Sequence, residues 1–226
     1  MESIVYNCDC MEAMAKLPDG AFDLAIVDPP YGIGKDWEKR KNNRRVPTNT
    51  VYKATSYTND AIPPQKYFDE LRRVAKERII WGYNYFAHIL GSTNYLIVWD
   101  KCCGRNDAVM YSKCEIAYTS FRVPCNIVHV PWDGYRMGEE TGTKKIHPHQ
   151  KPVALYDEIL NIYSKPGMRI LDTHVGSGSS RIAAYKAGLD FVGYEIDNDY
   201  FEAQELRFRN ALYGTQNTSE NQLKLF

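Results

Sequence analysis

Short apolar runs alternate with helical stretches along most of this 226-residue chain, and this alternation is what most restricts its fold. Apolar runs such as 22–27 and 169–172 have the length of buried strands. Between such runs, stretches such as 64–76 carry apolar residues at helical spacing. Strands that alternate with helices favour an α/β fold, in which helices cover both faces of a mainly parallel sheet.

The pattern predicts the order of these elements within one domain that spans residues 1–213. We expect strands at 4–6, 22–27, 78–81, 95–99, 115–120, 169–172 and 191–195. We expect helices at 11–17, 64–76, 85–90, 152–163, 179–186 and 198–212, the last of them capped by Asn198. Residues 121–147 keep no clear period and are predicted to form a small β-rich insertion. Residues 214–226 are predicted to form a flexible tail.

Charge is balanced over the whole chain, with 28 basic and 28 acidic residues, so any surface for nucleic acid must be local. Such a surface is predicted in a loop over residues 35–59, where basic residues outnumber acidic ones and apolar periodicity is absent. Its basic side chains are expected to contact DNA phosphates: Lys35, Lys39, Arg40, Lys41, Arg44 and Arg45. A solvated charged loop without a ligand is the plainer alternative.

Other sequence features argue against membrane insertion and against a metal site. No apolar run approaches 18 residues, and the N-terminus lacks a signal-peptide pattern, so we expect a cytoplasmic protein. The six cysteines lack the usual zinc spacing and are expected to be free thiols. We interpret His147, His149 and His174 as loop residues, and therefore expect no metal.

The tetrapeptide Asp28-Pro29-Pro30-Tyr31 directly follows the apolar run 22–27. Two consecutive prolines stiffen this turn, because proline has a fixed φ and no N–H group. The turn presents a carboxylate, a carbonyl and an aromatic ring together, which suits a planar ring that carries an amino group. On these four residues alone, a stiff loop that binds nothing is an equal alternative.

A second pattern joins the strand at 169–172 to the glycine turn Gly176-Ser177-Gly178, and Glu195 ends the following strand. The glycine turn lets the backbone approach a ligand closely, and the later acid can bind two ribose hydroxyls. The three-glycine dinucleotide pattern and a phosphate-binding lysine are missing. Asp172 would repel a pyrophosphate but attract a cationic methionine amine, and this favours S-adenosylmethionine as the cofactor.

Together these motifs resemble those of DNA methyltransferases that act on exocyclic amino groups, at adenine N6 or cytosine N4. The tetrapeptide is similar to the catalytic motif of that family, and residues 172–179 resemble its Asp-Pro-x-x-Gly-Ser-Gly-Thr cofactor motif. Further similarity lies in Asn7-Cys-Asp-Cys10, Trp81-Gly-Tyr-Asn-Tyr-Phe86 and His147-Pro-His-Gln-Lys-Pro152. The catalytic turn precedes the cofactor turn, as in the circularly permuted β class, and the resemblance covers residues 4–212.

The resemblance implies a Rossmann-like methyltransferase fold, double-stranded DNA as the substrate and a target base that is flipped out of the duplex. It implies that Asp28 and the Pro29 carbonyl accept hydrogen bonds from the amino group, while Tyr31 stacks on the base. The residues expected to bind S-adenosylmethionine are Asp9, Cys10, Asp28, Gln150, Lys151, Pro152, Asp172, His174, Gly176, Ser177, Gly178, Glu195 and Ile196. Segment 121–147 is expected to recognise the target, and homodimers are common in this class. No nuclease motif is present, so a stand-alone or phage-type enzyme is expected.

The choice of base and the cofactor site leave alternatives open. Aspartate at the first motif position favours adenine N6, because cytosine-N4 enzymes more often carry serine, but cytosine stays an alternative. Thr173 and His174 replace the usual Pro-Phe, which keeps open a non-catalytic DNA- or clamp-binding module. An RNA or protein-glutamine methyltransferase is disfavoured, because those usually carry Asn-Pro-Pro-Tyr after the cofactor motif.

The polar C-terminal stretch ends in the pentapeptide Gln222-Leu-Lys-Leu-Phe226, which carries three apolar side chains. It resembles the peptide that bacterial replication proteins insert into the sliding clamp. The residues expected to bind a clamp are Gln222, Leu223, Leu225 and Phe226. Folding of this peptide back onto the sheet is the alternative.

Overall fold

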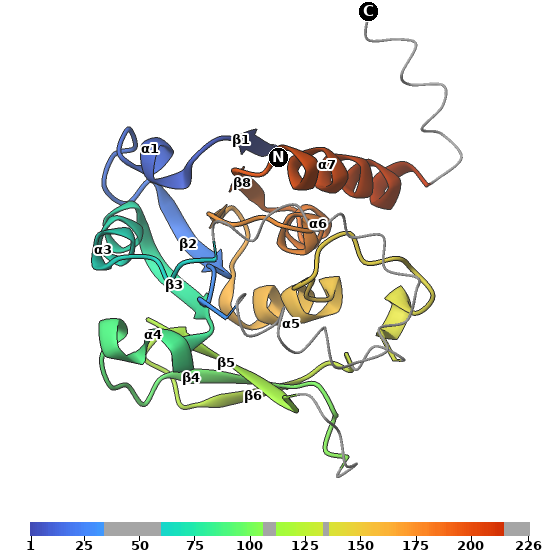
Figure 1. The fold of residues 1–226 in the computed structure, drawn as a ribbon, viewed down its shortest axis with the longest axis horizontal. Coiled ribbons are helices and arrows are strands. Elements are labelled where there is room, and N and C mark those ends of the chain that lie inside the picture. Colours follow the sequence, from blue (N-terminus) through green and yellow to red (C-terminus); the bar gives the residue numbers. More distant parts are fainter. Residues whose placement is uncertain (34–59, 106–111, 133–135, 215–226) are drawn as a thin grey trace, which may run out of the picture.

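A single eight-stranded sheet forms the centre of the computed structural model, which describes residues 1–33, 60–105, 112–132 and 136–214. The strand order is β1-β8-β7-β2-β3-β5-β4-β6 (Figure 1). The strands are β1 (Ser3–Asn7), β2 (Phe22–Val27), β3 (Ala75–Trp81), β4 (Leu96–Asp100), β5 (Cys114–Thr119), β6 (Asn126–His129), β7 (Arg169–Asp172) and β8 (Asp190–Glu195). Strand β5 is antiparallel to both neighbours, and the other pairs are parallel, which confirms the predicted mainly parallel sheet.

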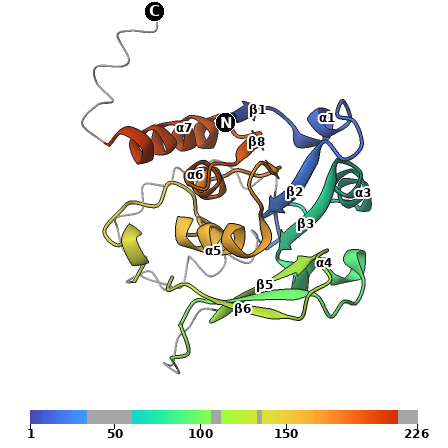
Figure 2. The same cartoon turned by 180° about the vertical axis from the view of Figure 1, so that it is seen from behind.

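Helices cover both faces of this sheet, as predicted (Figures 1 and 2). One face carries α1 (Cys10–Met14), α3 (Gln65–Val74) and α4 (Tyr83–Leu90). The other carries α5 (Val153–Tyr163), α6 (Ser179–Lys186) and α7 (Asn198–Tyr213). Leu24 and Ile26 of β2 pack with the second group of helices, and Ala25 and Val27 pack with the first. A strand covered on both faces needs a continuous apolar run, which explains the composition of residues 22–27.

Several element boundaries differ from the sequence predictions. The helix expected at 11–17 ends at Met14, and α3 ends at Val74 rather than at Lys76. Strand β3 begins directly at Ala75, whose backbone is already extended, so the strand expected at 78–81 starts three residues earlier. Asn198 does not cap α7. Instead the Asp197 carboxylate accepts hydrogen bonds from two backbone N–H groups of the first turn, at 2.9 and 3.1 Å.

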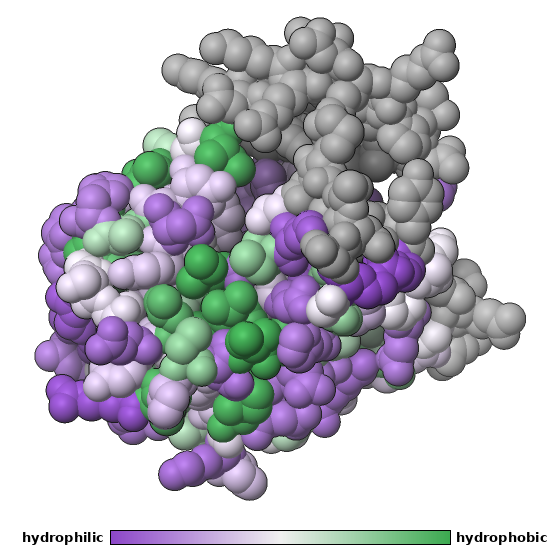
Figure 3. All heavy atoms as spheres, turned by 90° about the horizontal axis from the view of Figure 1, so that it is seen from below, coloured by the Kyte–Doolittle hydropathy of each residue, from purple (hydrophilic) through white to green (hydrophobic). Residues whose placement is uncertain are grey.

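The β-rich insertion predicted at 121–147 does not form a separate unit in the residues that the structure describes. Strand β6 within it pairs in parallel with β4 and is the outer edge of the main sheet, and η1 (Gly138–Glu140) is a single 3-10 turn. Figure 3 views the molecule from this side and shows hydrophobic residues gathered on this face. Val123 and Ile127 are exposed apolar side chains at this edge. Target recognition by this segment stays a prediction.

The strand order reverses between β7 and β2, and this reversal positions the site. The chain leaves β7 through α6 to reach β8, but it leaves β2 through α3 to reach β3 on the opposite side. In open α/β sheets, ligands bind beyond the carboxyl ends of the strands at such a reversal. Asp172 ends β7 and Asp28 follows β2, so the fold brings the two predicted motifs to one crevice.

Two predicted binding segments lie outside the described residues. These are the basic loop at 35–59 with its six candidate DNA contacts, and the tail after Gly214 with its candidate clamp peptide. Across the helices that the structure describes, none is long and apolar enough to cross a membrane.

Candidate active site

A cavity of about 820 Å³ opens at the carboxyl ends of β2, β7 and β8, a volume suited to a cofactor-sized ligand. The predicted site residues that line it are Asp9, Cys10, Asp28, Pro29, Pro30, Tyr31, Lys151, His174, Gly176, Ser177, Glu195 and Ile196. Four other predicted cofactor residues are not part of its lining: Gln150, Pro152, Asp172 and Gly178. The fold therefore brings the catalytic turn and most of the predicted cofactor residues to one cavity.

Asp28 is held by two hydrogen-bond donors in this cavity. The Tyr31 hydroxyl donates to Oδ1, and the Lys151 ammonium donates to Oδ2. Lys151 Nζ also lies 3.3 Å from the Tyr31 hydroxyl oxygen, and the lysine side chain is only 5% exposed. Asp28 and Glu115 raise the pKa of Lys151 against the opposing effect of its burial, so the ammonium stays charged. A buried ion pair thus fixes the carboxylate that the sequence predicts to be catalytic.

The ring of Tyr31 packs against residues at the start of α4. It stacks on Tyr85 with ring centroids 4.8 Å apart and an interplanar angle of 15°, and Phe86 meets it edge-on. Gly82 lies directly under the ring, since a Cβ built there would be 2.2 Å from Tyr31 Cε1. Gly82 also has a φ of +81°, a conformation that side chains with a Cβ disfavour. Both facts explain why glycine precedes the aromatic residues of the segment 81–86.

Glu115 on β5 is a site residue that the sequence reasoning missed. Its Oε2 lies 3.2 Å from Lys151 Nζ, and its Oε1 accepts a hydrogen bond of 2.9 Å from Lys101 Nζ. Burial disfavours the charged carboxylate, but the two lysines outweigh this effect and hold the pKa of Glu115 at about 2. The available signal was a charged residue inside a strand whose neighbours are mostly apolar, since a buried charge must find a partner.

The glycine turn and Glu195 hold each other in place. Glu195 accepts hydrogen bonds from the backbone N–H groups of Gly176, at 2.8 Å, and Asp197, at 2.9 Å. Burial nevertheless raises the pKa of Glu195 above its usual value. Ile196, the next residue, is 54% exposed at the cavity rim. The acid therefore faces the cavity in a fixed orientation beside an exposed apolar side chain.

The pair that departs from the family pattern, Thr173 and His174, is accommodated by hydrogen bonds. Thr173 Oγ1 lies 2.6 Å from the Tyr67 hydroxyl and 2.9 Å from His174 Nδ1. The Tyr67 ring packs edge-on against the His174 ring, and burial lowers the pKa of His174 to about 4. The histidine is therefore a neutral ring in the cavity wall at neutral pH.

The loop before α5 is anchored by Gln150, which does not line the cavity, and by Ser179, which does. Gln150 bonds to the Ile146 N–H at 3.0 Å and to the Glu140 carboxylate at 3.2 Å. The Ser179 hydroxyl donates to the Lys151 carbonyl at 2.6 Å, which joins this loop to the start of α6. Gln150 thus positions the backbone that presents Lys151.

The ring of His147 packs against the backbone of the glycine turn. Its ring lies 3.6 Å from where a Cβ of Gly176 would be, and burial lowers the pKa of His147 to about 3. Among the described residues, no group of three or more histidine, cysteine, aspartate or glutamate side chains could hold a metal ion.

Asp172 is buried at the end of β7 with its charge uncompensated by any cation in the described chain. It accepts hydrogen bonds from the Ser180 hydroxyl, at 2.6 Å, and from the His174 N–H, at 3.0 Å. Desolvation outweighs these bonds and raises the pKa of Asp172 to about 7. An ionised carboxylate that lacks a counter-ion is a destabilising feature of the protein without its ligand.

We expect Asp172→Asn to stabilise the protein without ligand at pH 8 but not at pH 4. Because the folded state holds the Asp172 proton more tightly than the unfolded state, the contribution of Asp172 to wild-type stability falls as pH rises from about 4 to about 7. Asparagine has the shape of the neutral acid and removes this loss, which can reach about 4 kcal/mol. Denaturant unfolding of both proteins between pH 4 and pH 8 measures the difference.

Asp23→Asn is the matched control, because the fold lowers the pKa of Asp23 whereas it raises the pKa of Asp172. Lys76 and the Arg169 N–H bind the Asp23 carboxylate and lower its pKa, so its charged form stabilises the fold. This variant is expected to be less stable than wild type at pH 8. If Asp172→Asn is no more stable than wild type at pH 8, the claim that the ionised Asp172 carboxylate destabilises the protein without ligand is wrong.

Comparison with known protein families gives a match over about half of the chain. The model of the N6/N4 DNA methylase family matches residues 91–206. Among curated proteins, the DNA adenine methyltransferase YhdJ of Escherichia coli strain K12 is 26% identical over 238 residues, which cover 88% of this chain and 80% of that protein.

Solved structures share the fold at low sequence identity. The putative DNA modification methylase TTHA0409 from Thermus thermophilus, complexed with S-adenosyl-L-methionine, superposes with a TM-score of 0.57 at 16% identity. That comparison covers 93% of this chain and 94% of the other. The PvuII DNA methyltransferase, which is cytosine-N4-specific, gives a TM-score of 0.62 at 12% identity, with 99% and 90% of the two chains covered.

Proposed function

The chain belongs to the N6/N4 DNA methylase family and is an S-adenosylmethionine-dependent DNA methyltransferase, and from this premise we propose that it methylates the N6 amino group of adenine. The observation that carries the proposal is the position of Asp28, Pro29 and Tyr31 in the wall of the cavity that also holds the glycine turn. A base amino group and a methyl donor can both be bound there.

The residues of the cavity fit S-adenosylmethionine. The Glu195 carboxylate accepts hydrogen bonds in a fixed orientation and can take those of two ribose hydroxyls. Asp172 accepts a hydrogen bond from the N–H of His174, a residue of the cavity wall, so its negative charge would favour a cationic ligand in the cavity. The bound cofactor supplies a methyl group on a positively charged sulfur. Glu195, Ile196, His174, Gly176 and Ser177 are the residues that we propose hold it.

Asp28 and its neighbours are proposed to prepare the amino nitrogen for methyl transfer. The lone pair of that nitrogen is delocalised into the base ring, which makes it a poor nucleophile. Hydrogen bonds from its N–H groups to the Asp28 carboxylate and the Pro29 carbonyl would localise the lone pair. The Asp28 carboxylate is paired with the Lys151 ammonium, and a carboxylate oxygen can only accept such bonds. Tyr31 offers a ring for stacking, worth about 1–3 kcal/mol.

Adenine is favoured over cytosine by two supporting observations. The first residue of the catalytic motif is aspartate, and YhdJ, with 26% identity, is a DNA adenine methyltransferase. We also infer membership of the β class, with its circular permutation, because the catalytic turn after β2 precedes the cofactor turn after β7 in the chain. Double-stranded DNA is proposed to lie across the cavity mouth. The basic residues at 35–59, which lie outside the described residues, stay candidates for contacting its phosphates.

Transfer of a labelled methyl group tests the proposed substrate. The protein is incubated with methyl-labelled S-adenosylmethionine and, separately, with unmethylated duplex DNA, RNA of the same sequence and an unrelated protein. Incorporation into the duplex alone is expected. Label in RNA or protein, with none in DNA, would overturn the proposal.

Clamp binding by the C-terminal pentapeptide stays a prediction, as does homodimer formation. Removal of residues 222–226 is expected to abolish retention of the protein on an immobilised bacterial sliding clamp, because these residues carry the whole predicted contact. Methylation of free DNA should be unchanged in the same variant. Equal clamp retention of the shortened and full-length proteins would rule out the contact.

A further inference from the structure

Both carboxylate oxygens of Asp28 are occupied in the free protein. Oδ1 accepts from the Tyr31 hydroxyl and Oδ2 accepts from Lys151. The proposed function requires at least one of these oxygens to accept from a base amino group. Each oxygen can accept a second hydrogen bond, but a base amino group that approaches Asp28 meets the Tyr31 hydroxyl and the Lys151 ammonium that are already bound there. Methyl transfer is favoured if one of these two donors can move aside.

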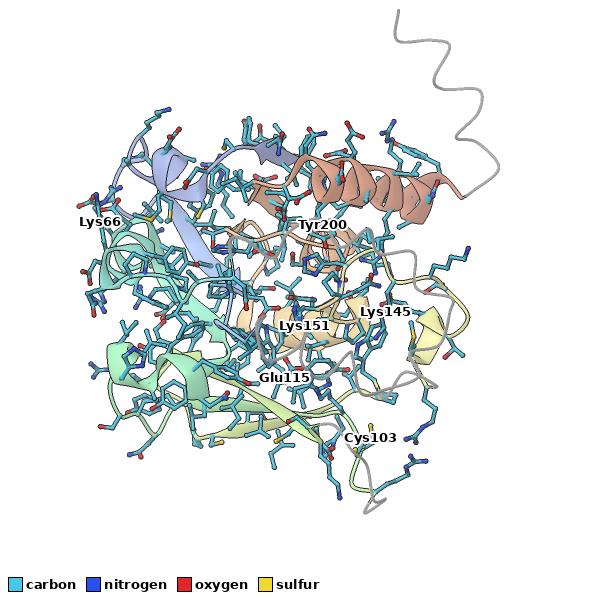
Figure 4. All side chains as sticks on the ribbon, in the orientation of Figure 1. Lys66, Cys103, Glu115, Lys145, Lys151 and Tyr200 are labelled. Carbon is cyan, nitrogen blue, oxygen red and sulfur yellow. The ribbon has the colours of Figure 1, made fainter. Side chains whose placement is uncertain are left out.

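Lys151 is the donor that has an alternative partner. Its Nζ lies 3.2 Å from Glu115 Oε2 while it is bound to Asp28 Oδ2 (Figure 4). Tyr31, by contrast, is fixed by its stack on Tyr85 and by the backbone of Gly82 beneath it. A small displacement of the lysine ammonium toward Glu115 would release Asp28 without leaving a buried charge unpaired.

Charges of alternating sign run through this part of the site. They follow the order Asp28, Lys151, Glu115 and Lys101, with Lys101 Nζ 2.9 Å from Glu115 Oε1. The Lys151 and Lys101 side chains are 5% and 12% exposed, so water screens these interactions only weakly. Glu115 remains ionised because the two lysines hold its pKa at about 2. The second partner of Lys151 is therefore charged at every pH at which an enzyme of this kind works.

We infer that Glu115 is a positioning residue for methyl transfer, because it holds Lys151 when a base amino group takes the place of the ammonium at Asp28. This inference rests on the proposed function. Glu115 touches neither base nor cofactor in this account and acts through Lys151. Without the Glu115 charge, the ammonium is bound to Asp28 alone, and the amino group must compete with a complete buried ion pair.

Glu115→Gln tests the inference by separating the rate of transfer from cofactor binding. The single-turnover rate at saturating cofactor and DNA is expected to fall at least about tenfold, while cofactor affinity changes less than about twofold. Glu115→Asp keeps the charge and is expected to recover part of the rate. The matched control is Glu77→Gln, the same change on the neighbouring strand β3, where the carboxylate accepts from Ser120 and lies outside the cavity.

A titration that needs no methylation reports on the ion pair itself. Carbon-13 NMR of the Glu115 carboxyl group is expected to show it ionised down to pH of about 2, and Lys151→Met should raise its pKa. A Glu115 pKa that does not respond to Lys151→Met would overturn the inference, whatever the activity.

The activity measurements distinguish the failure of this inference from that of the proposed function. If wild type transfers methyl groups to DNA but Glu115→Gln keeps its rate, only the positioning role is wrong. The role is also wrong if Glu115→Asp is no faster than Glu115→Gln, since only the charge is invoked. If wild type transfers no methyl group to DNA, the proposed function fails and the positioning role fails with it.

Discussion

Asp28→Ala should lower the single-turnover rate of DNA methylation about 1000-fold at saturating cofactor, because it removes the acceptor that localises the lone pair of the amino group. The estimate follows from the losses of about 100- to 1000-fold that accompany removal of a preorganised partner of a transition state. The larger figure applies here, since alanine also leaves Lys151 without its nearest carboxylate. Rapid-quench measurement of methyl transfer to a duplex determines the rate.

Asp199→Ala is the control for this prediction. Asp199 lies on the rim of the same cavity, is exposed, and is not part of the proposed chemistry. This variant is expected to keep a rate within about threefold of wild type. An Asp28→Ala protein that retains more than a tenth of the wild-type rate would contradict the proposed role of the carboxylate.

Gly82→Ala should lower the methylation rate about 100-fold or more, because the new Cβ would overlap the Tyr31 ring. The separation of 2.2 Å from Cε1 is far below any van der Waals contact, so Tyr31 must leave its stack on Tyr85. The Tyr31 hydroxyl then cannot reach Asp28, and the stacking platform for the base is lost. Steady-state rates with duplex DNA, together with thermal unfolding, measure the two consequences.

Gly91→Ala separates this clash from backbone strain. Gly91 ends the same helix with a φ of +77°, and a Cβ there meets nothing within 4 Å. Both variants therefore carry the cost of an alanine at positive φ, which is at least as large at Gly91 because its ψ of 176° lies outside the left-handed helical region. Only Gly82→Ala displaces Tyr31. Equal activity in the two variants would show that the position of the Tyr31 ring on Gly82 and Tyr85 does not matter for methylation.

The sequence was sufficient to predict a mainly parallel sheet with helices on both faces and seven of its eight strands. Apolar runs identify β2, β7 and β8, and parallel strands joined by helices must have their carboxyl ends on one side. Asp28, Glu195 and the glycine turn each follow such a strand, so their meeting in one cavity follows from the topology.

What could not be predicted depends on contacts between residues that are distant in the chain. Glu115 is paired with Lys151 because β5 is inserted between β3 and β4, which sequence order alone does not reveal. The direct passage from α3 to β3 at Ala75 lacks a turn residue and so gave no boundary signal. Asp172 and Gln150 are predicted to bind the cofactor, but neither lines the cavity, and both form hydrogen bonds with the loops and helix ends around it.

The central claim is that the turn at Asp28 presents a base amino group to the methyl donor, and the identity of the methylated nucleoside tests it most directly. Duplex DNA treated with the protein and S-adenosylmethionine is digested to nucleosides and analysed by mass spectrometry. We predict N6-methyladenine in the wild-type sample and none with Asp28→Ala. If N4-methylcytosine is found instead, only the choice of adenine is wrong, and the claim about the amino group stands. Methylation at a ring carbon, or no methylated base at all, would contradict the account.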